Sequence, residues 1–542
     1  MEKRPVTWWH RASVYQIYPL SFQDSNGDGI GDIPGIITRL DHLKNLGVDV
    51  IWLSPVFASP MKDNGYDVSD YTEVNPIFGT KADLKQLIDA VHQRGMKIIS
   101  DIVLNHTSDQ HPWFIDALKN PQSPYRDYYI FRKEKNDMQS LFSGPAWHLV
   151  PGRDEYYFHF FAKEQPDLNW QNPTLRKVLY QILNDWLAFG FDGFRLDVID
   201  LIGKDIDRGI IGHGPYYHPF LSELKKEVFN DTNLFTVGEL AGSTAQQAAA
   251  VTGLPDGTFS MAFQFSHLWL DEQPGKGKWA LKPLSIPDLQ KTFTAIDEVY
   301  SKQGWNALFM GNHDQPRPVS RYGSERHRYH SQTMLFLAFF GQRGTPFIYQ
   351  GEEIGMLNYP FRSIKEMKDV ESLNYYHDQL GKQAKATIMT SLKAKGRDNA
   401  RTPMQWNDRA QAGFTQGKPW LKVHPLYRKI NVKRDAKSNV SIQRFLTTLL
   451  NFRKKHDVFL DGNLSYRSFQ HEPIYAYTRS NQEETLLVLT SFSSRPLSIQ
   501  FPDFMEWEPI LTNHPTLSLA STMTLPPYFG GLYRKRSHHA ND

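Results

Sequence analysis

The chain has 542 residues, enough for several domains or for one large barrel with additions. Its 61 Lys and Arg residues and 58 Asp and Glu residues leave a net charge of +3, which excludes a nucleic-acid binder held by phosphate neutralisation. Cysteine is absent, so disulfide frameworks, zinc ribbons and thiol nucleophiles are excluded. No apolar run has the length of a signal peptide or of a membrane span. We therefore predict a cytoplasmic protein without a membrane partner.

Short β-type runs alternate with amphipathic helical runs over the first two-thirds of the chain. The first helical run, residues 33–46, carries apolar residues at helical spacing. The candidate strands are residues 13–17, 48–53, 96–104, 192–196, 234–237, 260–265, 307–310 and 346–349. Eight parallel strands with helical crossovers are what closes a (β/α)8 barrel, so we predict an α/β fold of the TIM-barrel type. An open doubly wound sheet is the alternative, but it usually has fewer units.

Two stretches interrupt this alternation. Residues 106–173, after the third strand, are loop-rich and aromatic, and they predict an inserted domain. Residues 463–542 contain short β runs separated by turn residues, and they predict a C-terminal antiparallel β-sandwich domain. The barrel then comprises residues 1–105 and 174–462, with a partly helical, polar extension near 369–456.

Polar residues follow four of the predicted strands, where barrel enzymes hold their reactive groups. They are Asn105-His106, Arg195-Leu196-Asp197, Gly238-Glu239 and Asn312-His313-Asp314. A single such group is more often a satisfied core residue or a cap, but four at one mouth favour catalysis. Arg195 favours a charged Asp197, as a nucleophile needs, and that charge raises the pKa of Glu239, as a general acid needs. This pattern fits glycoside hydrolysis with retention, and a purely structural ion-pair network is the alternative.

These segments resemble the signature segments of the α-amylase superfamily, glycoside hydrolase family 13. The likeness rests on GFRLD at 193–197, GE at 238–239, NHD at 312–314 and DIVLNH at 101–106. It implies that Asp197 is the nucleophile, Glu239 the acid/base, and Asp314 a third carboxylate that grips sugar hydroxyls. The same resemblance implies a glucose pocket lined by Arg195, His106 and His313.

A closer resemblance is to the oligo-1,6-glucosidase and dextran glucosidase branch of this family. Tyr66 and Asp67 match the pair that stacks on and hydrogen-bonds the terminal glucose in that branch. Arg397 matches the partner of that Asp. A salt bridge between Asp67 and Arg397 would close the pocket behind the non-reducing end, which implies an exo-acting enzyme. An ordinary surface ion pair, worth little, is the alternative.

The linkage preference is read from residues near the nucleophile. Val198, in the run Val-Ile-Asp at 198–200, and Glu371 resemble residues of members that cut α-1,6 bonds. Residues 240–242 are Leu-Ala-Gly, whereas dextran glucosidases tend to have Trp directly after the acid/base, which favours short isomalto-oligosaccharides. One or two side chains shift such preferences by only ~1–3 kcal/mol, so some activity on other α-glucosides is expected.

Residues 24–32, DSNGDGIGD, resemble a calcium loop. Oxygen-bearing side chains alternate as in an EF-hand, although Gly35 stands where the terminal Glu would be. The branch resemblance implies a structural Ca²⁺. Its expected ligands are Asp24, Asn26, Asp28, the Ile30 carbonyl and Asp32. A solvated turn is the alternative, and no organic cofactor is expected.

The sequence leaves several functions open beside a retaining exo-α-1,6-glucosidase. A trehalose-6-phosphate hydrolase shares the resemblance and needs a cation for the phosphate, for which Lys204 or Lys278 could serve. A transglucosidase or sucrose isomerase would keep water from the glucosyl-enzyme. A non-catalytic transporter heavy chain fits poorly, because all three carboxylates are present. The expected partner is a small oligosaccharide, and the expected state is a monomer.

Overall fold

The computed structural model, which describes residues 6–253 and 257–536, is built around a parallel sheet of eight strands. The strands, in spatial order, are β11 (Met261–Gln264), β10 (Phe235–Leu240), β9 (Gly193–Asp197), β5 (Lys97–Val103), β2 (Val50–Leu53), β1 (Val14–Ile17), β13 (Thr345–Tyr349) and β12 (Ala307–Leu308). A parallel bridge between Ala262 and Asn306 joins the two edges and closes the sheet into a barrel. The predicted TIM barrel is confirmed, and each of its strands overlaps a predicted run.

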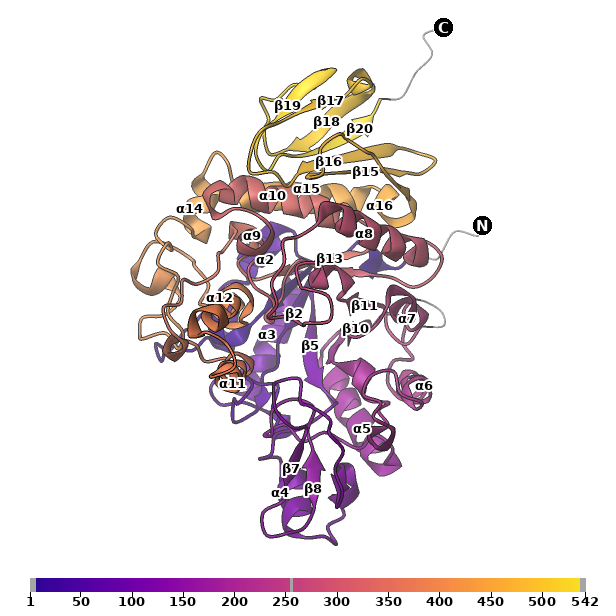
Figure 1. Ribbon diagram of the computed structural model, residues 1–542, viewed down its shortest axis with the longest axis vertical. Helices are drawn as coiled ribbons and strands as arrows, with labels where there is room; N and C mark the ends of the chain where they lie inside the picture. Colours follow the sequence, from indigo (N-terminus) through magenta and orange to yellow (C-terminus); the bar gives the residue numbers. More distant parts are fainter. Residues whose placement is uncertain (1–5, 254–256, 537–542) are drawn as a thin grey trace.

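Helices surround the sheet (Figure 1). The principal ones are α1 (Ile33–Ile37), α2 (Leu40–Leu46), α3 (Lys81–Gln93), α5 (Pro173–Phe189), α6 (Tyr217–Glu227), α7 (Ala245–Ala250), α8 (Ile286–Tyr300) and α10 (Arg328–Phe340). The helical run predicted over 33–46 is divided into α1 and α2. Its division follows from local bonding, because the Thr38 hydroxyl donates to the Gly35 carbonyl at 2.7 Å and ends α1 there.

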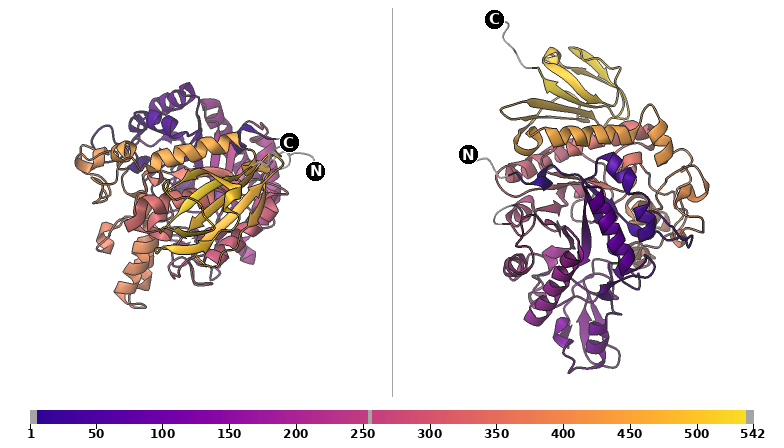
Figure 2. Two further views of the ribbon diagram at one scale, coloured as in Figure 1. Left: turned by 90° about the horizontal axis from the view of Figure 1, so that it is seen from above. Right: turned by 180° about the vertical axis from the view of Figure 1, so that it is seen from behind.

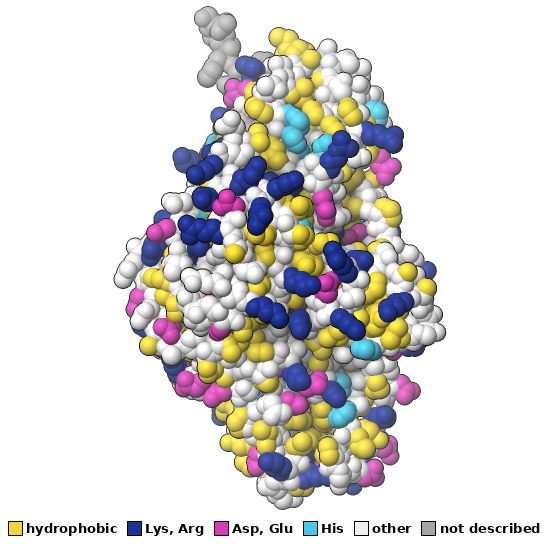
Figure 3. All heavy atoms as spheres, turned by 90° about the vertical axis from the view of Figure 1, so that its left-hand side faces the viewer, with side chains coloured by type: hydrophobic (Ala, Val, Ile, Leu, Met, Phe, Trp, Pro, Cys, Tyr) yellow, Lys and Arg dark blue, Asp and Glu magenta, His cyan; other side chains and the backbone are white. Residues whose placement is uncertain are grey.

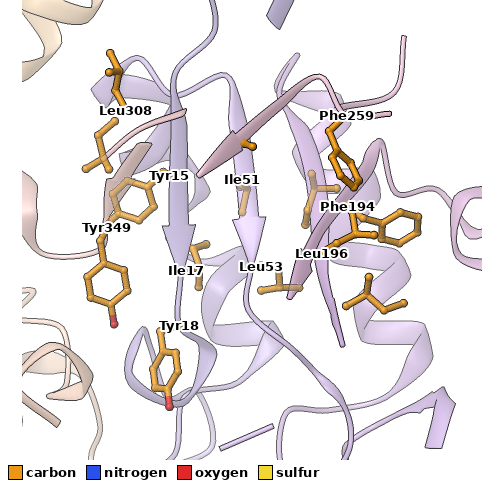
Figure 4. Packing of buried hydrophobic residues seen from close by; sticks show 14 of the residues in the cluster. Tyr15, Ile17, Tyr18, Ile51, Leu53, Phe194, Leu196, Phe259, Leu308 and Tyr349 are labelled. Atoms are coloured by element: carbon orange, nitrogen blue, oxygen red, sulfur yellow. The ribbon is translucent and has the colours of Figure 1, made fainter. Parts of the chain in front are cut away.

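Side chains of successive strand residues alternate between the barrel interior and the helical layer. Val50 and Trp52 belong to the interior cluster, whereas Ile51 and Leu53 pack in the larger cluster shared with the helices. Figure 4 shows Ile51, Leu53 and further members of this larger cluster on neighbouring strands. Successive side chains of a strand point to opposite faces of the sheet. At the end of each strand, therefore, every second residue faces the interior of the barrel.

Two smaller parts flank the barrel, below and above it in Figure 1. The insertion holds α4 (Pro112–Lys119) and a three-stranded sheet of β6 (Phe131–Arg132), β8 (Tyr156–Phe158) and β7 (Trp147–Leu149). The C-terminal part pairs a five-stranded antiparallel sheet with a two-stranded one. These strands are β14 (Asn463–Tyr466), β15 (Ile474–Ser480), β16 (Thr485–Ser491), β20 (Gly530–Lys535) and β18 (Trp507–Thr512) in one sheet, and β17 (Leu497–Gln500) and β19 (Thr522–Leu525) in the other.

The region between barrel and C-terminal sheets is helical, as expected near 369–456. It contains α11 (Val370–Gln379), α12 (Lys385–Lys395), α13 (Asp398–Arg401), α14 (Val432–Lys437) and α15 (Ile442–Lys455). Seen from above, the C-terminal strands lie over the barrel (Figure 2), and α10 and α15 lie between them. The exact domain boundaries stay a prediction, and residues 1–5 and 537–542 of the predicted domains lie outside the described residues.

The surface carries mixed charge. Figure 3 shows Lys and Arg side chains scattered over one face with Asp, Glu and hydrophobic side chains among them, in keeping with a net charge of +3. Within residues 6–253 and 257–536, no helix combines the length and the apolar character that a membrane span needs.

The loops that follow β9 and β10 are tied together by a buried carboxylate. Asp200 lies in the short helix after β9, and its Oδ2 accepts a hydrogen bond from the Gly242 N–H at 3.1 Å, in the loop after β10. His213 reinforces the link, since its Nε2 lies 2.6 Å from the Ser243 hydroxyl. Burial raises the pKa of Asp200 to about 7. These contacts fix the relative position of the two strand ends.

This raised pKa makes the contribution of Asp200 to stability dependent on pH. An unfolded Asp titrates at about 3.9, so the folded protein holds this proton more tightly, and the corresponding stability is lost as the pH rises through about 7. Asn at this position does not titrate, so the melting temperature of Asp200→Asn minus that of the wild type should increase as the pH rises from about 4 to about 7. Above about pH 7 this difference should no longer change with pH. Thermal unfolding across this range measures it, with Asp154→Asn at an exposed position as the control. A difference that is constant with pH would contradict the assignment.

Candidate active site

The charged side chains of the site continue the inward-facing rows of the strands. On β10 the interior residues Phe235 and Val237 are followed by Glu239, and on β9 Arg195 is followed by Asp197. The register pairs Arg195 with Asp101 of β5 on one side and with Val237 of β10 on the other. The barrel interior is therefore apolar toward the N-terminal ends of the strands and charged at their C-terminal ends.

The guanidinium of Arg195 contacts three buried carboxylates. Its Nη1 lies 2.8 Å from Asp101 Oδ1 and 2.7 Å from Asp197 Oδ1. Its Nη2 lies 2.7 Å from Glu239 Oε1. The other oxygen of Glu239 accepts the Val198 N–H at 3.0 Å. The predicted nucleophile and the predicted acid/base are thus brought together by one planar cation.

This cluster carries more acid groups than cations, and burial changes their pKa values. Burial raises the pKa of Asp197 well above its usual value, and the charges of Glu239 and Asp101 raise it further. Burial also raises the pKa of Glu239. A single guanidinium cannot balance three buried carboxylates, so the pair Asp197–Glu239 retains a proton to higher pH than free carboxyl groups would.

Asp314, the third predicted carboxylate, is surrounded by a second group of basic side chains, apart from Arg195. Its Oδ1 accepts from Arg401 Nη2 at 2.7 Å and from Arg397 Nη1 at 3.3 Å, and its Oδ2 lies 3.2 Å from His313 Nε2. Burial alone would raise the pKa of Asp314, but His313 and the two arginines hold it below its ordinary range. Asp314 is therefore an anion, ready to accept hydrogen bonds from hydroxyl groups.

The expected salt bridge between Asp67 and Arg397 is wrong. The carboxylate of Asp67 is buried and accepts the backbone N–H groups of Lys62 and Asp63 at 2.8 and 2.9 Å. Arg397 Nη2 instead contacts Asp63 at 2.8 Å and Asp369 at 2.6 Å. The physical reason is the tight turn of residues 61–67, which turns Asp67 onto its own backbone and presents Asp63 to Arg397.

The other predicted pocket residues gather around these two clusters. Tyr66 donates its hydroxyl to Asp101 Oδ2 at 2.8 Å, and its ring is stacked on His313 with a centroid distance of 5.0 Å. His106 Nε2 lies 3.1 Å from the Tyr66 carbonyl oxygen. Burial lowers the pKa of His106 to about 4 and that of His313 to about 3, so both imidazoles are neutral near pH 7.

Val198 follows Asp197 in a left-handed backbone conformation, with φ 37° and ψ 43°. A β-branched residue rarely adopts this region, and such strain typically costs about 1–3 kcal/mol. The conformation aims the Val198 N–H at Glu239 and lays the side chain against a cluster that contains Phe142, Phe161 and Leu201. Val198 thus borders both the acid/base and the apolar wall of the site.

The two lysines considered for a phosphate are both engaged. Lys204 is buried and contacts Asp167, and its Nζ donates to Asn105 Oδ1 at 2.5 Å. Lys278 Nζ lies 2.6 Å from Glu371, whose other neighbour is Arg397 Nε at 3.4 Å. Lys204 therefore holds the insertion against the barrel. Glu371 joins the site through Lys278 and Arg397, as its place in the predicted site requires.

Three residues of the site were missed by the sequence reasoning. Asp63 stands four residues before Asp67 in the same motif, and Asp101 opens the segment 101–106. Arg401 ends α13 and Arg397 is the residue directly before that helix, so the spacing of four brings the two side chains to one side of a single turn. Each residue lies within four positions of one that the sequence analysis named, but the sequence did not show which carboxylate each arginine would contact.

The residues of the predicted calcium loop lie between β1 and α1. Asp24 accepts the N–H groups of Asn26, Gly27 and Gly29, and Asp32 accepts those of Ser25 and Gly35. Their donor types suit a hard cation. Among the described residues, no group of three or more His, Asp or Glu side chains is arranged to hold a metal ion.

Known proteins resemble this chain over nearly its full length. An oligo-1,6-glucosidase of Parageobacillus thermoglucosidasius is 46% identical over 519 residues, 92% of each chain. A glucan 1,6-alpha-glucosidase of Streptococcus pneumoniae is 46% identical over 491 residues, 90% of this chain and 92% of its own. A crystal structure of trehalose-6-phosphate hydrolase from Bacillus licheniformis superimposes with a TM-score of 0.92 at 40% identity, covering 98% of this chain and 100% of its own.

A family model is matched as well as these individual proteins. The description of the model is alpha amylase, catalytic domain, and it spans residues 16–462, which include seven of the eight strands, the end of β1 and every carboxylate of the site. The order of the strands, the acidic cluster at their ends and the match over most of the chain agree with one another. The chain belongs to the α-amylase family and is a glycoside hydrolase.

Proposed function

We propose that this enzyme is a retaining, exo-acting α-glucosidase that removes glucose from the non-reducing end of α-1,6-linked isomalto-oligosaccharides and short dextrans. The names of its relatives support the linkage, since an oligo-1,6-glucosidase and a glucan 1,6-alpha-glucosidase each match nine-tenths or more of the chain. The site itself supports the exo mode and the retaining mechanism.

The observation that carries the exo mode is the contact between Asp63 and Arg397. The two side chains meet at 2.8 Å, both are buried, and Asp369 holds Arg397 from a third side. A buried, multiply bonded pair of this kind is costly to open, typically about 3–5 kcal/mol when one partner is removed. A glucan chain cannot pass through it, so only a terminal sugar would enter.

In the proposed mechanism Glu239 gives its proton to the glycosidic oxygen while the Asp197 carboxylate attacks the anomeric carbon. The bond to the leaving sugar breaks and a β-glucosyl ester forms on Asp197. Glu239 then takes a proton from water, which attacks the same carbon and releases α-glucose. Retaining enzymes need their two carboxyl groups only ~5–5.5 Å apart, which suits two carboxylates that share the guanidinium of Arg195.

Asp314 supports the transition state in this proposal. Its low pKa keeps it ionised while Glu239 gives up its proton and regains one from water, so it can accept hydrogen bonds from sugar hydroxyl groups throughout the reaction. Tyr66 and the neutral His106 and His313 would complete the pocket around the terminal glucose. Val198 and Glu371 would border the departing sugar, with Arg195 fixing the two reacting carboxyl groups.

Trehalose-6-phosphate hydrolysis is less well supported. A phosphate ester needs a cation that is free to form charge-assisted hydrogen bonds. Lys204 and Lys278 are each bound to a carboxylate, at Asp167 and at Glu371. Moving Lys204 onto the phosphate would leave the buried Asp167 without its cation, which is unfavourable, and moving Lys278 would leave Glu371 with Arg397 alone.

The proposed activity is tested by glucose release from isomaltotriose, with maltose and trehalose 6-phosphate in parallel. We expect release from isomaltotriose at a kcat/KM at least tenfold above those of the other two substrates, since a tenfold ratio requires only about 1.4 kcal/mol in the transition state. Polarimetry or NMR of the first product should show α-glucose. A preference for trehalose 6-phosphate would overturn the proposal, and transfer of glucose to a second sugar without net release would favour a transglucosidase.

The roles of the two reacting carboxyl groups are tested by one pair of variants. Asp197→Asn should lose activity on every substrate. Glu239→Gln should lose about 10²–10⁴-fold on isomaltose but keep the first step on aryl glucosides with good leaving groups, because these need little acid help. A single-turnover burst of the released phenol measures this step. Equal loss in both variants would show that the roles are assigned wrongly.

We further propose that the loop of residues 24–32 binds a structural Ca²⁺ and that the enzyme works in the cytoplasm as a monomer. The loop offers carboxylate, amide and carbonyl oxygens within nine residues. Asp28 is exposed, and Gly27 and Gly29 donate their backbone N–H groups to Asp24, which winds the loop around that carboxylate. The cytoplasmic location rests on the absence of cysteine.

Removal of Ca²⁺ should lower thermal stability without changing the chemistry of the site. A ligand that binds only the folded protein stabilises it by about 2.7 kcal/mol at a concentration one hundred times its Kd. A strong chelator should therefore lower the melting temperature of the wild type, and added Ca²⁺ should restore it. The Asp28→Ala variant is the matched control and should not respond to either treatment. An unchanged wild-type melting temperature in the chelator would refute the calcium loop.

A further inference from the structure

A second cavity lies beside the active site, between α11, α12 and the hairpin of residues 271–282. Its volume is about 740 Å³. The hairpin is closed by hydrogen bonds from Gln273 N to the Ala280 carbonyl at 2.8 Å and from Lys282 N to the Asp271 carbonyl at 3.0 Å. The cavity is large enough for more than one sugar ring, and none of its lining residues belongs to the catalytic cluster described above.

The lining of this cavity suits a neutral, hydroxyl-rich ligand. Trp279 and Tyr375 stack on each other with a centroid distance of 4.5 Å and form an aromatic wall. Amide and hydroxyl side chains surround it, among them Gln273, Gln383 and Thr387. Of the lining side chains in the described part of the chain, only that of Lys276 is charged near pH 7. An aromatic surface with a few amide and hydroxyl groups is typical of sugar-binding sites, and it lacks the cluster of cations that an anionic ligand needs.

Two residues of the cavity lining lie next to the Lys278–Glu371 contact along the chain. Lys278, directly before Trp279 in the hairpin, contacts Glu371 at 2.6 Å and contributes to lowering the pKa of Asp314. Tyr375 follows Glu371 by four residues on α11, so it lies one turn, about 5.4 Å, further along the helix. A glucan that leaves the site past the Lys278–Glu371 contact would therefore meet the aromatic wall next.

We propose that this cavity, defined by Trp279, Tyr375, Gln383 and Thr387, is a distal subsite that binds the outer sugars of longer α-glucan substrates. The inference rests on the proposed function for the identity of the ligand. The terminal glucose is held at the closed end beside Asp63 and Arg397, and the distal subsite holds the far end of the chain. Isomaltose does not reach the cavity, whereas an isomalto-oligosaccharide of several units does.

The proposal is tested by substitutions at exposed positions, one on α12 and one in the segment just before it. Thr387→Tyr fills the cavity, and Gln383→Ala removes an amide from its wall; both positions are exposed. Lys393→Tyr, an exposed position on the same helix outside the cavity, is the matched control. We expect Thr387→Tyr to lower kcat/KM for isomaltohexaose about tenfold, and Gln383→Ala less, while kcat/KM for isomaltose stays within twofold of the wild type. A parallel loss on both substrates, or no loss on either, would overturn the proposal.

A binding measurement separates this proposal from the proposed function. In the Asp197→Asn variant, isomaltohexaose should bind more tightly than isomaltose and quench tryptophan fluorescence, and adding Thr387→Tyr should abolish the difference. If the wild type released no glucose from isomaltose, the proposed function would fail, but tighter binding of the hexaose that Thr387→Tyr removes would still support the cavity as a glucan site. Equal affinities for both sugars would refute it.

Discussion

The arrangement of the site depends on one buried cation. Arg195 lies with no exposed surface between Asp101, Asp197 and Glu239, which come from three adjacent strands. Removing one partner of a buried ion pair typically costs about 3–5 kcal/mol, and here the loss of one guanidinium would leave three acid groups facing one another. The strand register must therefore be correct before the carboxyl groups can be buried. Their burial in turn produces the raised pKa values on which acid catalysis relies.

A second cationic cluster gives the pocket its closed end. Arg401 of α13 and Arg397, directly before that helix, contact Asp314 from the loop after β12 and Asp369 from the loop before α11. Asp63, from the loop after β2, completes the cluster. These five residues span more than 330 positions of the sequence. Because His313, Arg397 and Arg401 together hold the pKa of Asp314 below its ordinary range despite burial, this carboxyl stays ionised while the pair Asp197–Glu239 retains a proton, so the two clusters can perform different tasks in one pocket.

The sequence predicted the barrel and the groups at its strand ends because both follow from periodicity: every second strand residue faces inward, and the last of these are charged. Its prediction that Asp67 contacts Arg397 was wrong, since Asp63 and Asp369 do so. Asp63 and Asp67 lie in one turn. The backbone N–H groups of Lys62 and Asp63 donate to the Asp67 carboxylate, and this bonding leaves Asp63 as the residue of the turn that contacts Arg397. The same limit applies to Lys204, whose type suggested a phosphate site but whose contact with Asp167 comes from the folded insertion.

The closed end and the open end of the pocket place different demands on the substrate. At the closed end, the contact of Asp63 with Arg397 admits one terminal sugar and fixes its position. At the open end, the contact of Lys278 with Glu371 is partly exposed, with 23% and 11% of the side chains accessible. The chain lacks a Trp directly after Glu239, where Leu240 and Ala241 stand. In the proposed distal subsite, discrimination by chain length comes from residues further out, among them the stacked pair of Trp279 and Tyr375.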